Sequence, residues 1–388
     1  MKFELKSLLT LIFFAALLGM ACRKPFDPGS ISGFSSALIV EGVINPTGVT
    51  NIYLSRTLDI NDKSAVRPEL SATVQVLSEN NTAVTLTGRP GGLYTIPQLS
   101  LNSSQKYRLR VRTASGTEYM SDPMAVRNTP AIDSVNWVRG ADGVGIYINT
   151  HDSQNNTRYY QWDFEEDWEL RSLGSTEYKA ILLPFGGVSI ILRDPAEIPL
   201  MQVCYKSQRS NSIDVFSTAK LQSDIVSRHP IMFIPNNSDK LSVRYSILVR
   251  QHAIPFEAFE YLSMMKRNSE ELGSFFDAQP SELVGNIRNV NDKNDVAIGY
   301  VVIAPVLEKR IFITRDQVPA WPFKLNCEFI NVVANPDSMR PYYGPGQGYL
   351  PDAPERNDRG VIVKWHGITE TCLDCRARGG NNNKPGFW

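Results

Sequence analysis

Histidine is scarce in this chain, which has only four among 388 residues. They are His151, His229, His252 and His366. None lies in the His-Glu-x-x-His pattern of a zinc hydrolase, and no Gly-x-Ser-x-Gly elbow provides a serine nucleophile for them. Each is therefore expected to be an ordinary polar residue, and no metal or other cofactor is expected.

An excess of basic charge is missing as well. Lysine and arginine together number 40, and so do aspartate and glutamate, which leaves a formal net charge of zero. Proteins that bind nucleic acid usually carry a clear basic excess, because they must neutralise phosphates. The charge balance thus argues against nucleic acid as a partner.

Long apolar runs are absent too, since no stretch approaches the roughly 20 residues that span a bilayer. The longest run, residues 8–18, follows two lysines and is typical of a signal peptide. It closes with Gly-Met-Ala-Cys22, which resembles a bacterial lipobox. We expect a signal peptide over 1–21, lipidation of Cys22 and a tether over 22–35. Ordinary secretory cleavage after Ala21 is the alternative.

Cysteine is sparse and odd in number, with five residues in all. If Cys22 carries lipid, an even four remain for an oxidising compartment: Cys204, Cys327, Cys372 and Cys375. A local bridge between the last two would hold little of the fold together. We therefore favour two disulfides in which the tail cysteines reach back, one to Cys204 and one to Cys327. A Cys₄ zinc site and a redox dithiol are the alternatives, but only one Cys-x-x-Cys occurs and no βαβ pattern surrounds it.

What the sequence does contain is β patterning, and we predict a mainly β protein. Short alternating segments separated by turn signals predict an immunoglobulin-like β-sandwich over 36–128. Within it Tyr107, Leu109 and Val111 alternate towards one face, and Tyr107 resembles the tyrosine corner of Greek-key sandwiches.

A second β-rich domain is expected over 129–333. It contains an inserted amphipathic helix over 255–272, which starts at Pro255 and stops at Gly273. The remaining segment, 334–388, is rich in Pro, Gly and Asp, and we expect an irregular tail tied down by disulfides.

An aromatic and acidic strand stands out in the second domain. Aromatic residues occupy one face: Tyr160, Trp162, Phe164 and Trp168. The accompanying acidic row is Asp163, Glu165, Glu166, Asp167 and Glu169. A solvated outer face is the favoured interpretation. A Ca²⁺ site or a glycosidase carboxylate pair are the alternatives, since next neighbours along a strand face are about 6.6 Å apart.

A tyrosine-rich tract follows in the irregular segment. Its aromatic residues are Tyr342, Tyr343 and Tyr349. Tyrosine provides contact area at low entropic cost. We therefore consider these three residues a contact surface for a partner, a glycan or a peptide.

These features together resemble a known family. The motifs are Tyr-Tyr-Gln-Trp-Asp-Phe-Glu-Glu-Asp-Trp-Glu from Tyr159, Cys204-Tyr-Lys-Ser, Gly285-Asn-Ile-Arg-Asn-Val, and the terminal Cys-x-x-Cys before Lys-Pro-Gly-Phe-Trp388. Over nearly the whole mature chain they look like the Bacteroidota envelope lipoproteins catalogued as domain of unknown function number 4249. The resemblance implies a lipoprotein often associated with TonB-dependent outer-membrane transporters, and it supplies no catalytic residues.

We therefore expect an outer-membrane lipoprotein that meets the membrane through its lipid anchor. It would act as a non-enzymatic binding or accessory subunit, with a TonB-dependent transporter as the partner that the resemblance implies. The alternative is an envelope hydrolase of glycans or peptides that uses acidic residues of the second domain.

Overall fold

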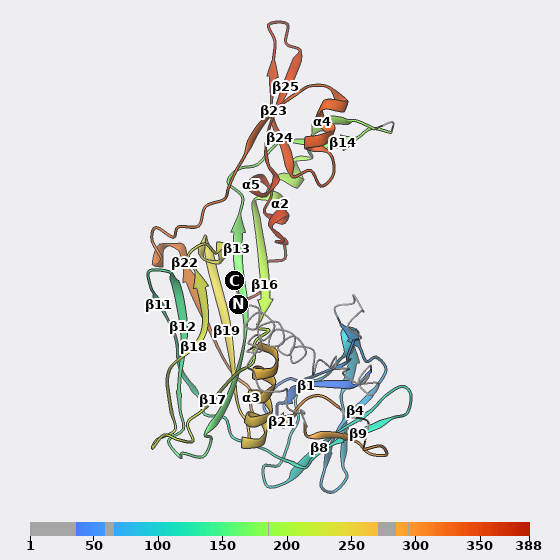
Figure 1. Cartoon of the computed structure of the whole chain (residues 1–388), viewed down its shortest axis with the longest axis vertical. Helices are drawn as coiled ribbons and strands as arrows, with labels where there is room; N and C mark the ends of the chain where they lie inside the picture. The colour runs from blue at the N-terminus through green and yellow to red at the C-terminus, as the bar shows by residue number, and fades with distance from the viewer. Residues whose placement is uncertain (1–35, 59–65, 185, 271–284, 294, 296) are drawn as a thin grey trace, which may run out of the picture.

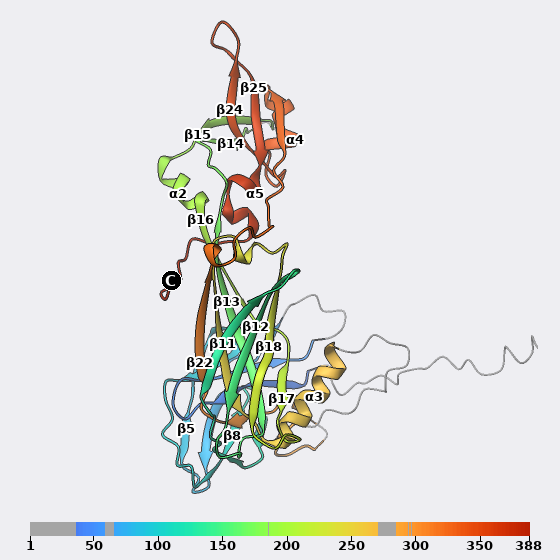
Figure 2. The ribbon, with the colours of Figure 1, turned by 90° about the vertical axis from the view of Figure 1, so that its left-hand side faces the viewer.

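The protein is a mainly β chain whose three bodies form an elongated molecule, as the computed structural model shows in two perpendicular views (Figure 1, Figure 2). The structure describes residues 36–388 except 59–65, 185, 271–284, 294 and 296. The expected signal peptide, the lipidated Cys22 and the tether therefore lie outside the described residues. Within these ranges no helix is both long and apolar enough to cross a membrane.

The first domain is a β-sandwich of two six-stranded sheets, which confirms the predicted architecture. One sheet contains β1 (Leu38–Ile44), β2 (Thr50–Arg56), β3 (Arg67–Pro68), β6 (Thr87–Arg89), β7 (Leu93–Ile96) and β21 (Val302–Ile303). The other contains β4 (Thr73–Ser78), β5 (Ala83–Thr85), β8 (Lys106–Arg112), β9 (Glu118–Ser121), β10 (Met124–Ala125) and β20 (Ile287–Asn289). Aliphatic side chains from both sheets form one buried core.

The predicted tyrosine corner is present in β8. Tyr107, Leu109 and Val111 point into the core, as the alternation predicts. The Tyr107 hydroxyl accepts a hydrogen bond from the Asn102 backbone N–H at 2.7 Å and lies 3.4 Å from the Asn102 carbonyl oxygen. The hydroxyl thereby satisfies backbone groups five residues upstream, where the chain enters the strand.

The boundary predicted at residue 128 is only partly right, because the chain returns to the first domain later. β20 pairs with β9, and β21 lies parallel to β1 with Val43 opposite Val302. A sheet edge exposes unpaired backbone groups that any suitable segment can satisfy. Local patterning does not reveal that a segment near residue 300 fills this role.

The second domain is a sandwich of its own. Its three-stranded sheet contains β11 (Ile132–Arg139), β12 (Gly143–His151) and β18 (Ile225–Pro235). Its five-stranded sheet contains β13 (Tyr159–Arg171), β16 (Val203–Arg209), β17 (Asp214–Ser217), β19 (Arg244–Ala253) and β22 (Leu307–Thr314). The aromatic face of β13 packs into the core between the two sheets, with Trp162 almost completely buried.

Helix α3 (Phe256–Glu270) lies where the two sandwiches meet (Figure 1). Ala258 and Ile254 are buried against Val302 of β21, so the helix packs on both domains. The Tyr261 hydroxyl accepts a hydrogen bond from the Gly299 backbone N–H at 2.9 Å. The amphipathic helix is therefore confirmed, whereas its predicted end and the stop at Gly273 lie outside the described residues.

A third body forms the far end of the molecule, so the prediction of an irregular tail over 334–388 is wrong. Its strands are β14 (Tyr178–Leu182), β15 (Val188–Leu192), β23 (Phe329–Val333), β24 (Tyr349–Arg356) and β25 (Ile362–Thr369), and its helices are α2 (Ile198–Gln202), α4 (Pro336–Tyr343) and α5 (Glu370–Leu373). Val188 packs with Trp365 in its core, although 177 positions separate them in the sequence. The β14–β15 hairpin, inserted between β13 and β16, thus supplies part of the core that the tail lacks by itself.

Two disulfides link segments of the third body to each other and to the second domain, called the central domain from here on. Cys204 of β16 pairs with Cys375, and Cys327 pairs with Cys372. Each tail cysteine thus reaches back to one of the two expected partners. Because all four sulfurs are in disulfides, neither the zinc site nor the free dithiol is formed.

Candidate functional site

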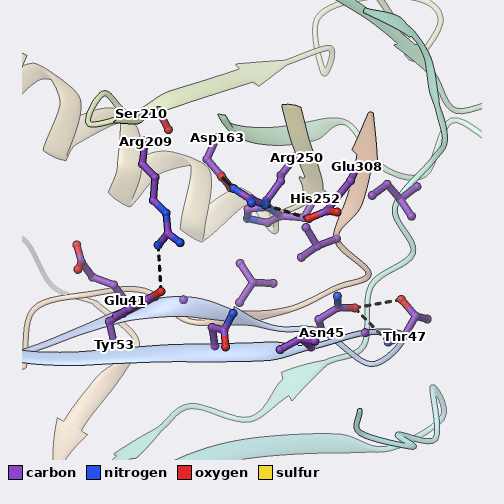
Figure 3. A pocket seen from close by; sticks show the side chains of 17 residues that line it. Glu41, Asn45, Thr47, Tyr53, Asp163, Arg209, Ser210, Arg250, His252 and Glu308 are labelled. Atoms are coloured by element: carbon purple, nitrogen blue, oxygen red, sulfur yellow. Dashed lines mark hydrogen bonds and ion pairs between the residues drawn. The ribbon is translucent and has the colours of Figure 1, made fainter. Parts of the chain in front are cut away.

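The first and second domains enclose a polar cleft of about 860 Å³ (Figure 3). Strands β1 and β2 and the turn between them form one wall. The other wall is the outer face of the five-stranded sheet of the second domain, called the central sheet below. It is formed at β13, β19, β22 and the end of β16. The cleft therefore exists only because two separately folded sandwiches lie against each other.

Arg250 is the centre of the wall formed by the central sheet. Its Nη1 lies 3.1 Å from Asp163, its Nη2 lies 3.0 Å from Glu165, and its Nε lies 3.0 Å from Glu308. The three carboxylates come from β13 and β22, which flank β19 on either side. One guanidinium thus binds three acids in a fixed arrangement, which its planar set of donors allows.

This arrangement shifts the pKa values of the groups involved. Burial lowers the pKa of Arg250, but the three carboxylates outweigh that effect and raise it. Burial raises the pKa of the Asp163 carboxyl, and the charge of Arg250 opposes this without cancelling it. Asp163 is therefore the carboxyl in the cleft that holds its proton more tightly than usual.

A second arginine links the two walls. Arg209, at the end of β16, donates a hydrogen bond from Nη1 to the hydroxyl oxygen of Tyr53 at 3.1 Å, and this bond raises the pKa of Arg209 (Figure 3). Glu41 lies beside Tyr53 on the opposite wall. The lining thus combines charges of both signs with hydroxyl and amide groups, and carboxylates outnumber guanidinium groups.

His252 also belongs to the lining, and its imidazole ring is almost completely buried. It is only 2% exposed, and burial lowers its pKa to about 4, so the ring is neutral at pH 7. Its Nε2 lies 3.1 Å from Gln161 Oε1, an acceptor, so Nε2 carries the proton. Nδ1 is then an acceptor, and it is buried without a hydrogen-bond partner in the part of the chain that the structure describes.

The structure divides the acidic row of β13, and the prediction of one solvated face is wrong. Asp163 lines the cleft, and Glu165, on the same face of β13, lies 3.0 Å from Arg250 Nη2. Asp167 is buried with Arg310 at 3.0 Å, and the Trp388 indole of the chain end covers Glu169, with Nε1 donating to Oε2 at 3.3 Å. Asp167 and Glu169 therefore interact with other side chains and are shielded from solvent.

Glu166 lies on the opposite face of β13 and is 1% exposed. The Tyr245 hydroxyl donates to its Oε1 at 2.6 Å and Lys240 Nζ donates to its Oε2 at 2.7 Å. Strand alternation places position 166 on the aromatic face, so its burial follows from the pattern. The pattern does not predict its two partners, Tyr245 of β19 and Lys240 of the segment before that strand.

The tyrosine tract is split between core and surface. Tyr343 is 5% exposed and its hydroxyl donates to the Trp365 carbonyl oxygen at 3.2 Å, so its predicted role as a contact residue is wrong. Tyr342 and Tyr349 remain accessible, with ring centroids 6.5 Å apart. Their role in partner contact stays a prediction.

The other three histidines, His151, His229 and His366, do not line the cleft. The imidazole rings of His151 and His229 each lie 2.8 Å from an aspartate oxygen, of Asp133 and Asp214 respectively. No group of three or more His, Cys, Asp or Glu that could hold a metal occurs within the described ranges.

Sequence reasoning missed most of the cleft, although one signal was available. On β19 the inward residues are odd-numbered up to Val249, which places Arg250 and His252 on the same face as Asp163. Nothing local indicates that β1 and β2 cover this face.

Taken together, the two sandwiches and the space between them define a multidomain β protein with an interdomain cleft lined mainly by polar and charged residues. The chain belongs to the family described as Domain of unknown function (DUF4249), whose model matches residues 23–310. A search of curated proteins finds no match. The family match ends within β22, so most of the third body and three of the four paired cysteines lie beyond it.

Proposed function

We propose that this protein is an outer-membrane lipoprotein anchored through Cys22, and that it is a non-enzymatic binding or accessory subunit. Its ligand occupies the cleft between the first two domains. The partner is a TonB-dependent transport system, as the family resemblance suggests. The observation that carries the binding role is the state of the acidic groups around Arg250.

General acid–base catalysis requires a carboxyl group that can exchange a proton with the substrate. Asp163, Glu165 and Glu308 instead share one guanidinium, each at about 3 Å. Such a network favours a rigid, hydrogen-bonded surface over a reactive one. The hydroxyl, amide and guanidinium groups around it provide donors and acceptors for a glycan or a peptide.

The disulfides support a location outside the cytoplasm. Disulfides persist in oxidising compartments and are rare in the bacterial cytosol. Both bridges join segments distant in sequence, with separations of 171 and 45 residues, and three of the four cysteines are buried. Together with the lipobox-like sequence before Cys22, they favour export and anchoring.

The binding role is tested by titrating a panel of glycans and peptides into the purified protein and following it by calorimetry. For a ligand found in this way, Tyr53→Phe and Arg209→Gln should weaken binding at least tenfold. Tyr147→Phe, on β12 of the sheet that does not border the cleft, is the matched control and should leave the affinity within twofold. Equal effects of Tyr53→Phe and Tyr147→Phe would contradict a site in this cleft.

The anchor and the partner are tested in membranes. Radiolabelled palmitate should enter the wild-type protein but not Cys22→Ala, and only the wild type should fractionate with the outer membrane. A tagged wild-type chain purified in mild detergent should bring down an outer-membrane transporter. Recovery without such a partner, under conditions that preserve other transport complexes, would contradict the accessory role.

One observation favours the rival function, a hydrolase. Asp163 has a raised pKa, as a general acid requires, and lies in a cleft beside Glu308. If the panel contains a substrate, Asp163→Asn should abolish its turnover while Asp167→Asn leaves turnover intact. Turnover that survives Asp163→Asn would contradict Asp163 as the general acid, and no turnover by the wild type leaves the binding role in place.

A further inference from the structure

A second pocket, of about 610 Å³, lies at the neck between the central domain and the third body. Its walls come from the end of β13, the start of β19, the end of β22, the loop before Cys327 and the turn after Cys375. Both disulfides lie next to these walls, because Leu325 precedes Cys327 by two residues and Arg378 follows Cys375 by three. The pocket is therefore held by covalent links and is distinct from the interdomain cleft.

Four basic side chains line this neck pocket: Arg171, Arg315, Lys324 and Arg378. Arg171 is neutralised by Glu169, with Nε 2.7 Å from Oε1. Among the residues that the structure describes, the other three form no ion pair with a carboxylate within 4 Å. The lining contains no acidic residue, so it carries an excess of positive charge.

Arg378 is the cation of this pocket whose donors the surrounding protein satisfies least completely. Its Nη2 donates to the Arg171 carbonyl oxygen at 2.5 Å, while its Nε is buried and has no partner in the described part of the chain. Burial lowers the pKa of this guanidinium, and the nearby charge of Asp239 offsets this only in part. A partly buried guanidinium with an unsatisfied donor and no paired carboxylate gains from an added anionic acceptor.

The rest of the lining is apolar. Leu173 is 71% exposed, and Phe323 and Leu325 are half-buried beside the cations. An exposed leucine next to other apolar side chains offers a surface that gains by being covered. One wall thus suits an anionic group, and the adjoining wall suits a hydrocarbon.

We propose that the neck pocket binds an amphiphilic anion, namely a carboxylate or phosphate head group attached to an alkyl chain. The head group accepts hydrogen bonds from Arg378 and lies near Arg315 and Lys324. The alkyl chain covers Leu173, Phe323 and Leu325. The volume lies within the range typical of small-molecule sites.

The test uses the full chain with Cys22→Ala, so that no acyl group of its own competes, purified without detergent and with both disulfides intact. The probe is dansyl-aminoundecanoic acid, whose fluorescence rises in an apolar site. Dodecanoate and dodecyl phosphate are the competitors, and dodecyl maltoside below its micelle concentration is the neutral control. Saturable one-site binding is expected, with displacement by the two anions and not by the maltoside.

Lys324→Gln combined with Arg315→Gln should weaken binding at least tenfold, and so should Arg378→Gln. The double variant is included because Arg378 also donates a hydrogen bond to a backbone carbonyl oxygen, so Arg378→Gln can fail to fold. Arg359→Gln, an exposed arginine in the third body that removes the same charge, should stay within twofold of the wild type. Tighter displacement by dodecyl phosphate assigns a lipid phosphate, and tighter displacement by dodecanoate assigns a fatty acid.

Three results would overturn the proposal. One is the absence of saturable binding, and another is equal competition by dodecyl maltoside, which would show that charge is irrelevant. The third is displacement by inorganic phosphate at the concentration at which dodecyl phosphate acts, which would show that the alkyl chain contributes nothing.

Discussion

Replacing Glu166 by glutamine should destabilise the central domain by about 3 kcal/mol. The carboxylate is 1% exposed and accepts hydrogen bonds from Tyr245 and Lys240 at 2.6 and 2.7 Å. Glutamine keeps the shape, but its amide can accept from only one of these donors, so Lys240 loses its counter-charge beside the Trp168 ring. Removing one partner of a buried pair costs about 3–5 kcal/mol. We expect the lower end, because the Lys240 side chain keeps 14% exposure and can turn towards water.

Urea unfolding followed by tryptophan fluorescence measures this effect, since Trp162 and Trp168 belong to the same core. Tyr245→Phe removes one hydrogen bond to a charged acceptor and should cost about 2 kcal/mol. A triple variant, Glu166→Met with Lys240→Met and Tyr245→Phe, removes the whole polar group and should cost less than Glu166→Gln. A triple variant less stable than the single one, or a loss below about 1 kcal/mol for Glu166→Gln, would refute this reasoning.

Three further predictions concern the bridges and the cleft. Replacing Cys327 and Cys372 by alanine opens a loop of 45 residues and should cost about 4 kcal/mol, seen as a lower urea midpoint; an unchanged midpoint would contradict it. Because burial lowers the pKa of His252 to about 4, below about 6.5 in the unfolded chain, the unfolded state takes up the proton first as pH falls. As the pH falls from about 6.5 to about 4, the free energy of unfolding should drop by up to about 3 kcal/mol more in the wild type than in His252→Gln. Urea unfolding at each pH measures this difference. Arg250→Met leaves three facing carboxylates and should cost about 2–3 kcal/mol at pH 7. The loss should be smaller at low pH, where Asp163 takes up its proton because burial raises its pKa; an equal loss at both would count against the network.

Much of the local structure could be predicted because it depends on short-range patterns. The inward row of β8 follows from alternation, and the start of α3 follows from Pro255 and the apolar stripe. The choice of disulfide partners could also be narrowed, since a bridge between neighbouring cysteines would constrain little chain. For the acidic strand the same alternation predicts that Glu166 points inward, yet its cluster of like charges suggested an exposed row.

The prediction failed where pairing is non-local. The segment 334–388 contains many turn-forming residues, which hide its two strands, and it has too few apolar residues to form a core by itself. It folds because β14 and β15, more than a hundred residues earlier, complete that core. The first domain likewise completes its sheets with β20 and β21, which follow the helix. Such contacts leave no periodic trace in either segment alone.

Composition and patterning were enough to predict a mainly β chain of several domains with balanced charge, and they favoured tail cysteines that reach back. The sequence also carries the lipobox-like cysteine on which the expected anchoring depends. Only the tertiary structure decided that Arg250 binds three carboxylates, that His252 lies buried in the same wall, and that two sandwiches close a cleft over them. The reason is physical: alternation along a strand decides which face a side chain occupies, whereas the groups opposite that face come from distant parts of the chain and are chosen by packing.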